Sequence, residues 1–312
     1  MSESVDKLHP LDMSVTIAGV RLRNPVIAAS GTFGYGMEYN KIFDVRCLGA
    51  ICSKGLTLNP RSGNTGMRLW ETPAGLMNSI GLENPGIPAF IEKELPQMRR
   101  LGPAIIANLS GSTVEEYEEG ARLLDASSVD MVELNISCPN VKAGGMAFGL
   151  DPETAAVAVS QVRKALRNKP LMVKLSPNAG DLPAVARACV KAGADAVSLV
   201  NTFKAMAIDV QKRRLVFDNT TAGLSGPAIR PIALRMVWEV CEALGPQVPV
   251  VGMGGIACAD DALEFLMAGA VAVQVGSTTF AEPLAMCNIV DGIWGYMRDN
   301  GIATLGDISL RG

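Results

Sequence analysis

Eight short runs of apolar, often β-branched residues recur along the chain, and the end of each contains Gly, Ser, Asn or Lys. The first four occupy residues 24–30, 49–55, 104–111 and 131–137, and the second four occupy residues 171–177, 196–202, 248–255 and 270–277. Their continuous rather than alternating apolar character is typical of strands buried on both faces of a parallel sheet. The two longest intervals follow the second and sixth runs, which predicts an inserted segment at each of those places.

Helix signals fill the intervals between these runs. Capping residues predict helix starts at Ser112-Thr113, at Asp151 before Pro152 and at Asp181, with Gly193 ending the last of these helices. Further helices are predicted over residues 229–244 and 259–270. Eight strands that alternate with helices predict an α/β fold of the (β/α)8 barrel type, with a doubly wound sheet as the alternative.

The segment before the first run has a different pattern. Residues 14–22 predict a β-hairpin that turns near Ala18-Gly19 and closes the N-terminal end of the barrel. We expect residues 1–312 to form one barrel domain, because such barrels commonly run to about 250 residues. Residues 1–10 are expected to be a flexible arm.

Composition and charge exclude several classes of protein. The net charge of −3, from 28 basic and 31 acidic side chains, argues against a nucleic-acid binder, and 48% hydrophobic residues argue against disorder. The seven cysteines are scattered without a CxxC pair, which fits neither a disulfide framework nor a zinc or iron–sulfur site. The first residues contain no apolar stretch of signal-peptide or membrane-span length. We therefore expect a soluble cytoplasmic protein without a structural metal.

Polar residues gather at the ends of the predicted strands, where (β/α)8 enzymes carry their chemistry. They are Ser30, Lys54, Asn108, Asn135 with Cys138, Lys174, Asn201 with Thr202, Gly254-Gly255 and Gly276-Ser277. Solvation of the strand ends would explain any one of them but explains the whole set poorly. The two glycine turns follow the seventh and eighth strands, where barrels commonly bind phosphate through backbone N–H groups. A phosphorylated ligand is therefore expected.

Two lysines at strand ends leave two chemistries open. Lys174 or Lys54 suits a Schiff-base lyase, and a lysine beside a flavin ring suits stabilisation of the reduced anion. Asparagines favour a cyclic imide such as a pyrimidine, because an amide both donates and accepts hydrogen bonds. The only histidine is His9, outside the predicted barrel, which argues against a general-base histidine. Cys138 lies just past the fourth strand among polar residues and is therefore the candidate cysteine for chemistry.

With these residues in place, the sequence resembles the class 1 dihydroorotate dehydrogenases, and specifically their NAD-linked B-type catalytic subunit. The resemblance runs from about Leu11 to Ile302. It is carried by NPVIAASGTFGYG, SKGLTLNPRSGN, GLMNSIGLENPG, IIANLSGS, NISCPNVKAGGMAFG, VKLSPN, LVNTF, LSGPAIRPIAL and GMGGI. The cysteine in NISCPN fits class 1, because the membrane-bound class 2 enzymes have serine there.

The resemblance implies an FMN enzyme that oxidises dihydroorotate to orotate in pyrimidine biosynthesis. Cys138 would remove the C5 proton of the substrate while C6 delivers hydride to flavin N5. By motif position, the FMN contacts would be Ser30, Lys54, Gly55, Asn108, Asn135, Lys174, Val200, Gly226, Gly254, Gly255, Gly276 and Ser277. The substrate contacts would be Lys54, Asn78, Ser79, Ile80, Gly81, Leu82, Asn135, Asn140, Asn201 and Thr202, with Lys54 facing the carboxylate.

The same resemblance implies partners. A homodimer would join an electron-transfer subunit that carries FAD and a [2Fe–2S] cluster, forming a heterotetramer that reduces NAD. This chain has no GxGxxG between a strand and a helix and no cysteine cluster, so FAD and the iron–sulfur cluster are expected only on the partner. The stretch DNTTAGLSG, residues 218–226, is less glycine-rich than the family pattern before Gly226.

Related alternatives are a dihydropyrimidine dehydrogenase-like pyrimidine reductase and the fumarate-linked A-type enzyme. The alternatives of other classes are the Schiff-base lyase and a flavin-storing or ligand-sensing barrel without catalysis.

Overall fold

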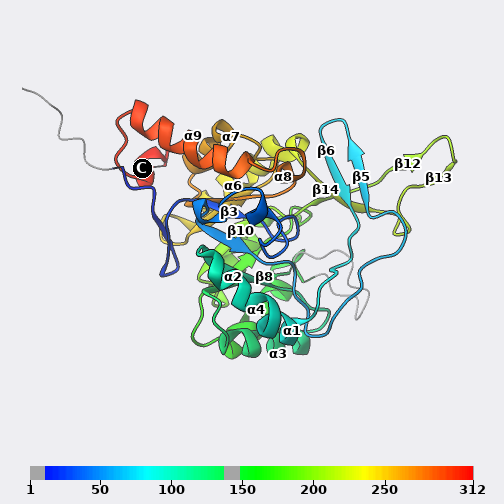
Figure 1. The fold of residues 1–312 in the computed structure, drawn as a ribbon. Coiled ribbons are helices and arrows are strands. Elements are labelled where there is room, and N and C mark those ends of the chain that lie inside the picture. Colours follow the sequence, from blue (N-terminus) through cyan, green and yellow to red (C-terminus); the bar gives the residue numbers. More distant parts are fainter. Residues whose placement is uncertain (1–10, 137–147, 312) are drawn as a thin grey trace, which may run out of the picture.

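Eight parallel strands close into a barrel in the computed structural model, which describes residues 11–136 and 148–311 (Figure 1). In chain order the barrel strands are β3 (Val26–Ala28), β4 (Ala50–Cys52), β7 (Ala104–Leu109), β8 (Met131–Asn135), β9 (Leu171–Lys174), β10 (Ala196–Leu199), β15 (Val250–Met253) and β16 (Ala272–Val275). Each strand pairs with the next, and β16 pairs with β3. All eight fall within the predicted runs, which confirms the (β/α)8 barrel and excludes the doubly wound alternative.

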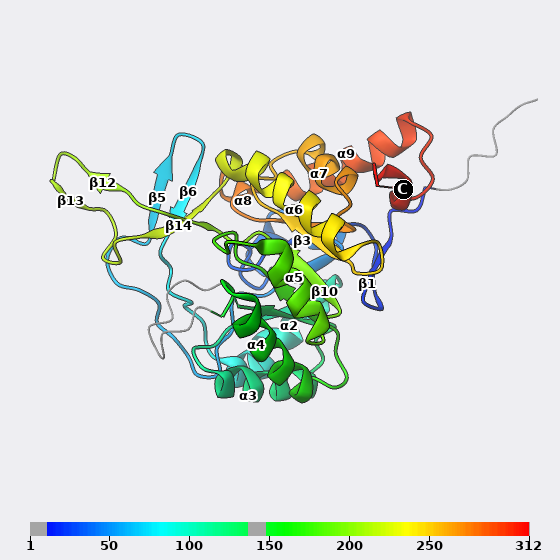
Figure 2. The ribbon, with the colours of Figure 1, turned by 180° about the vertical axis from the view of Figure 1, so that it is seen from behind.

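Helices cover the outside of the barrel, as the views from both sides show (Figures 1 and 2). They are α1 (Ile87–Ala89), α2 (Leu95–Leu101), α3 (Val114–Asp125), α4 (Pro152–Ala165), α5 (Leu182–Lys191), α6 (Arg230–Leu244), α7 (Ala259–Met267), α8 (Thr278–Ala281) and α9 (Ala285–Asp299), with a π-helical turn at Phe90–Glu94 joining α1 to α2. Short 3-10 turns lie at Tyr39–Lys41, Val45–Cys47, Pro227–Ile229 and Leu305–Ile308. Because helices cover one face of each strand and the opposite strands cover the other, the strands are apolar throughout.

Side-chain caps fix where three of these helices begin. Thr113 Oγ1 accepts a hydrogen bond from the Glu116 N–H of α3 at 3.2 Å. Asp151 Oδ2 accepts from two N–H groups of α4, and Asp181 Oδ1 accepts from one N–H of α5. The predicted caps are therefore confirmed. The helix predicted over 259–270 ends earlier, at Met267, because Gly269 with a φ of 104° breaks the helical path.

The predicted N-terminal hairpin is present as β1 (Val15–Ile17) and β2 (Val20–Leu22), paired antiparallel. Ala18 and Gly19 form its turn, both with positive φ. Ile17 and Leu22 are buried in one cluster with inward-facing barrel residues such as Ile27 and Ile106. The hairpin therefore closes the N-terminal end of the barrel, as predicted, and the opposite end stays available for a ligand.

The two predicted insertions come together over that opposite end. The first carries β5 (Leu69–Thr72) and β6 (Gly75–Asn78), and the second carries β11 (Phe203–Ala205), β12 (Ile208–Asp209), β13 (Arg214–Leu215) and β14 (Ala222–Ser225). Antiparallel pairing of β6 with β14 joins them into a four-stranded sheet in the order β11-β14-β6-β5. The small β12–β13 hairpin projects beyond this sheet (Figure 2).

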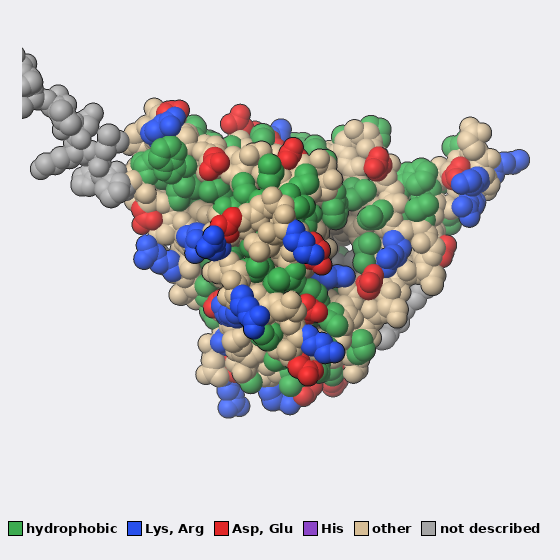
Figure 3. All heavy atoms as spheres, viewed as in Figure 1, with side chains coloured by type: hydrophobic (Ala, Val, Ile, Leu, Met, Phe, Trp, Pro, Cys, Tyr) green, Lys and Arg blue, Asp and Glu red, His purple; other side chains and the backbone are tan. Residues whose placement is uncertain are grey.

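The described surface carries acidic and basic side chains of both signs interspersed on the face shown in Figure 3. This distribution agrees with the small net charge. Within residues 11–136 and 148–311, no helix combines the length and the apolar character needed to cross a bilayer.

Candidate active site

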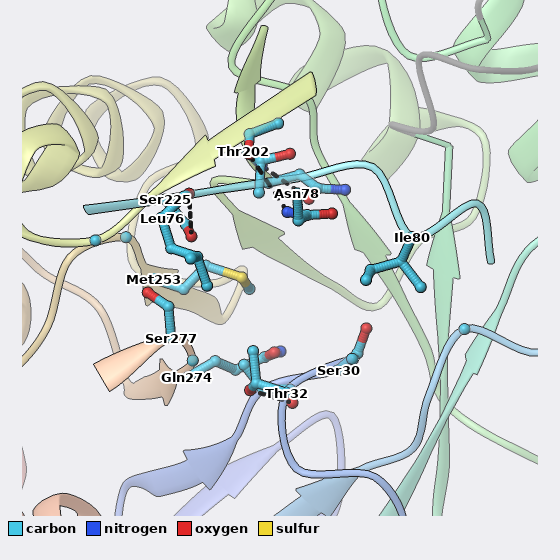
Figure 4. Close-up of a pocket in the computed structure, with 18 of the residues that line it drawn as sticks. Ser30, Thr32, Leu76, Asn78, Ile80, Thr202, Ser225, Met253, Gln274 and Ser277 are labelled. Atoms are coloured by element: carbon cyan, nitrogen blue, oxygen red, sulfur yellow. Dashed lines mark hydrogen bonds between the residues drawn. The ribbon is translucent and has the colours of Figure 1, made fainter. Parts of the chain in front are cut away.

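A cavity of about 450 Å³ lies at the C-terminal ends of the barrel strands. Strand-end loops of the barrel form one part of its wall, and the inserted sheet contributes Leu69, Leu76, Asn78, Gly223 and Ser225 (Figure 4). A volume of this size is typical of small-molecule and cofactor sites. The architecture therefore places a ligand-sized cavity at the end of the barrel where the sequence predicted the chemistry.

The cavity brings together the predicted site residues of the described chain, with one exception. Its lining includes Ser30, Lys54, Gly55, Asn78, Ser79, Ile80, Gly81, Leu82, Asn135, Lys174, Val200, Asn201, Thr202, Gly226, Gly254, Gly255, Gly276 and Ser277. The exception is Asn108, which is fully buried and turns its amide nitrogen toward Glu133 inside the barrel. Cys138 and Asn140 lie outside the described residues.

Three glycines approach one another on one wall of the cavity. Gly226, Gly254 and Gly255 have φ values of 101°, 131° and 75°, a region that favours glycine. A Cβ built on Gly255 would lie 2.7 Å from the Gly226 carbonyl oxygen, and one on Gly254 would lie 2.6 Å from the Ala233 Cβ. Glycine therefore lets these segments pack closely at this wall, and glycine turns of this kind can bind anionic groups through backbone N–H donors.

The segment 218–226, which departs from the family pattern, is ordered by the inserted sheet rather than by glycine turns. Its residues 222–225 form β14, and Asn219 Nδ2 donates a hydrogen bond to Ser79 Oγ at 3.4 Å. Gly226 follows directly after this strand, so the sheet fixes its position.

The loop of residues 78–82 is held by polar contacts. Asn64 Nδ2 donates to both the carbonyl oxygen and the hydroxyl of Ser79, at 3.1 and 3.0 Å. Gly81 and Leu82 both have positive φ, which turns the loop back toward the barrel. Thr202 directly precedes β11 of the second insertion and packs so closely against Gly223 that a Cβ on that glycine would collide with it. The two insertions thus present Asn78 and Thr202 on the same side of the cavity (Figure 4).

A buried carboxylate lies beneath the cavity floor. Glu133 on β8 is fully buried and accepts hydrogen bonds from Asn108 Nδ2 at 2.6 Å, Ser198 Oγ at 2.7 Å and Gln274 Nε2 at 2.6 Å. Cys52 Sγ is a fourth, longer donor at 3.3 Å. The Glu133 carboxylate therefore accepts hydrogen bonds from side chains on four other barrel strands.

The ionisation of Glu133 follows from these neighbours. Burial by itself would raise the pKa of this carboxyl group, but the positive charge of Lys174 opposes burial, and hydrogen bonds from Gln274, Ser198 and Asn108 add to that effect. The net result is a pKa below the usual 4.5, so the carboxylate is charged at neutral pH. Lys174 itself is 5% exposed and lines the cavity.

Sequence reasoning missed Glu133, Ser198 and Gln274. Each interrupts a predicted apolar run with a polar side chain, and that interruption was the available signal. At the cavity rim it also missed Arg61, Asn64 and Glu83, where the Arg68–Glu83 ion pair is 2.6 Å long. In the described part of the chain, no cluster of His, Cys, Asp or Glu side chains is arranged to hold a metal ion.

The polar residues at the strand ends are buried, so exposure to solvent does not explain why they are polar. Asn135 and Lys174 are 6% and 5% exposed, and Asn108 is fully buried. A cavity with a buried cation, several amides and a glycine wall can bind a ligand that has both an anionic group and a polar ring.

Comparisons with known proteins agree with this site. The family model described as dihydroorotate dehydrogenase matches residues 12–297. The chain is 55% identical over 298 residues to the "Dihydroorotate dehydrogenase B (NAD(+)), catalytic subunit" of Petrotoga mobilis, covering 96% of this chain and 98% of that protein. Proteins of the same name from Geotalea uraniireducens and Thermoanaerobacter pseudethanolicus are 53% and 50% identical, covering 95% and 96% of this chain and 97% and 98% of theirs.

Among solved structures, the dihydroorotate dehydrogenase of Eimeria tenella in complex with ferulenol has the same fold. The TM-score is 0.80 at 20% identity, covering 99% of this chain and 90% of that one. The family match over most of the chain and the identity to full-length relatives lead to one conclusion: this chain belongs to the dihydroorotate dehydrogenase family.

Proposed function

We propose that this chain oxidises dihydroorotate to orotate with a bound FMN, as the NAD-linked catalytic subunit of a larger enzyme acting in pyrimidine biosynthesis. The observation that carries the proposal is that family-motif residues from distant parts of the chain line one cavity. Relatives matched over nearly their whole length are named as such catalytic subunits. A Schiff-base lyase has no comparable support.

The cavity fits FMN in two respects. Gly226, Gly254 and Gly255 line the cavity together with Gly276 and Ser277, and backbone N–H groups of such glycine turns suit the phosphate. Gln274 Oε1 is a buried acceptor that receives no hydrogen bond from any described residue, which suits a ring that carries an N–H. The ring would be held by Ser30, Lys54, Gly55, Asn135, Lys174 and Val200. Asn108 would act from behind the cavity wall by binding Glu133.

FMN supplies the two-electron acceptor when it is bound, and the chain supplies the rest. Lys54 pairs with the substrate carboxylate through a charge-assisted hydrogen bond. The amides of Asn78, Asn135 and Asn201 bind the polar edges of the pyrimidine, and Ser79, Ile80, Gly81, Leu82 and Thr202 complete the contacts. Asn140 adds a further amide. Cys138 removes the C5 proton as its thiolate.

We expect the purified chain to contain one FMN, released into solution when the protein is denatured. The reason is the combined fit of the glycine wall and the buried polar floor to a phosphorylated ring. The measurement is the absorption and fluorescence spectrum of the supernatant after denaturation. A colourless chain that gains no flavin on reconstitution, yet is trapped by borohydride with a carbonyl substrate, would contradict the proposal and favour the lyase.

We expect the isolated chain to reduce artificial acceptors with dihydroorotate but to reduce NAD poorly. It has no dinucleotide fingerprint, and its cysteines are not clustered as a [2Fe–2S] site requires. Addition of an iron–sulfur subunit carrying FAD should confer NAD reduction, with a homodimer of this chain at the centre of a heterotetramer. Efficient NAD reduction by the pure chain would overturn this electron route, and fumarate reduction would point to the A-type class.

A further inference from the structure

The two ends of the Gln274 amide group have different surroundings. It lies on β16, is 1% exposed, and lines the cavity beside Ser30 and Thr32 (Figure 4). One end of the amide is 2.6 Å from Glu133 Oε1, and the other end has no described partner. A buried acceptor without a hydrogen-bond donor destabilises the fold, so we expect a ligand to donate a hydrogen bond to this end.

The orientation of the amide follows from the chemistry of Glu133. An ionised carboxylate only accepts hydrogen bonds, so the group 2.6 Å away must be the NH₂ end of Gln274. For the same reason, Asn108 turns its NH₂ end toward Glu133 Oε2. Ser198 supplies a further donor to Oε1. Glu133 therefore holds the oxygen of Gln274 away from itself, and this buried oxygen is left to the cavity as an acceptor.

We infer that Gln274 Oε1 accepts a hydrogen bond from the imide N–H of the bound ligand, and that Glu133 is the positioning residue that fixes this orientation. The inference rests on the proposed function. Two ligands of the proposed reaction carry an imide N–H between two carbonyl groups, the flavin and the pyrimidine. A carbonyl oxygen paired with Gln274 would instead face another acceptor and would be repelled.

The surroundings of Gln274 assign it to the flavin. It lies among Ser30, Ser277 and Met253, whereas Asn78 and Thr202, which we assign to the pyrimidine, lie together at the other side of the cavity (Figure 4). The same strand leads directly into Gly276 and Ser277, which we assign to the phosphate side of the cofactor. Gln274 and Glu133 thus select FMN by its ring edge, in addition to the phosphate contacts.

The test compares FMN with 3-methyl-FMN, in which a methyl group replaces the imide proton. The full chain is stripped of flavin and titrated with each compound by fluorescence. The parental chain should bind 3-methyl-FMN about tenfold more weakly or worse, the scale of one lost buried hydrogen bond. Gln274→Met should bind FMN about tenfold more weakly and should discriminate less than about threefold between the two compounds.

Glu133→Gln separates positioning from simple contact. The new amide no longer requires an NH₂ group opposite it, so Gln274 is free to rotate. FMN binding and the discrimination against 3-methyl-FMN should both fall, although Gln274 is unchanged. Exposed controls, Gln97→Met and Glu118→Gln, should retain both properties. A purely structural role of Glu133 would lower affinity for the two compounds equally, which would overturn the positioning role.

Each other outcome is decisive. Equal binding of FMN and 3-methyl-FMN by the parental chain would overturn the contact and leave the proposed function intact. Failure of the parental chain to bind FMN at all would contradict the proposed function itself. Weakened orotate binding by Gln274→Met, with unchanged FMN binding, would overturn the assignment to flavin and move the contact to the pyrimidine. The comparison on the parental chain needs no variant, so it stands even if a substitution prevents folding.

Discussion

Replacement of Cys138 by serine is expected to slow reduction of the flavin by dihydroorotate by about 10²–10⁴-fold, the usual contribution of a general base. A free thiol has a pKa of about 8.5, and only its thiolate accepts the C5 proton, whereas an unassisted hydroxyl stays protonated throughout this range. The rate of the parental enzyme should therefore rise from neutral to mildly alkaline pH. Anaerobic stopped-flow absorption, with pH as the variable, measures both effects.

The matched control is Cys189→Ser. Cys189 is buried on α5, and burial raises the pKa of its thiol to about 12, so it supplies no thiolate at neutral pH. Its replacement should leave the rate of flavin reduction and the pH profile largely unchanged. FMN content and orotate affinity should also change little in Cys138→Ser, because those contacts are assigned to other residues. A parental rate and pH profile in Cys138→Ser would show that the base has been assigned wrongly.

Glu133→Ala is expected to lower the free energy of unfolding of the flavin-free chain by about 3–5 kcal/mol. The change removes the acceptor of Asn108, Ser198 and Gln274 together and leaves the buried charge of Lys174 uncompensated. The loss is large against the total stability of about 5–15 kcal/mol that is usual for a folded protein. Urea unfolding followed by circular dichroism measures it. Glu118→Ala, on the exposed face of α3, should change stability by less than about 0.5 kcal/mol.

Glu133 should also affect how the stability of the folded chain depends on pH. The pKa of Glu133 is lower in the folded chain than its usual 4.5, so the unfolded chain binds more protons between these two values. The contribution of Glu133 is therefore fully present above about pH 4.5 and is lost as the pH falls through the folded pKa. In Glu133→Ala this part of the acid dependence should disappear. A stability and an acid dependence equal to those of the parental chain would contradict the role given to this carboxylate.

The barrel was predictable from the sequence because its strands are buried on both faces and appear as separate apolar runs. The inserted sheet was not, because its edge strand β5 is exposed and has no such run, and because β6 pairs with β14, which comes from an insertion that lies far away in the chain. Helix α9 was also missed. Its Gly292 and Gly295 weaken the helical pattern, but Gly292 lets α9 pack closely on Ala259 of α7, where a Cβ would collide.

Part of the site, like part of the fold, could be predicted from the sequence. Lysines and asparagines at strand ends could be named in advance because every strand of a closed barrel ends at the same face. The roles of the polar residues beneath them could not be predicted, because Glu133 and Gln274 act by hydrogen bonding to each other. They lie 141 residues apart in the chain and meet only when β8 and β16 face the same barrel interior. Periodicity assigns a residue to a face of its own strand, but it does not identify the side chain that this residue meets across the barrel.

Anaerobic bleaching tests most directly whether the cavity holds FMN in position to take electrons from dihydroorotate. The purified chain is placed under an inert atmosphere without any other subunit, and its visible flavin absorption is followed while dihydroorotate is added. We predict that the yellow colour is lost as the flavin is reduced, that orotate is formed in equal amount, and that the colour returns on admission of oxygen. A bound flavin that keeps its absorption in excess dihydroorotate would contradict the account.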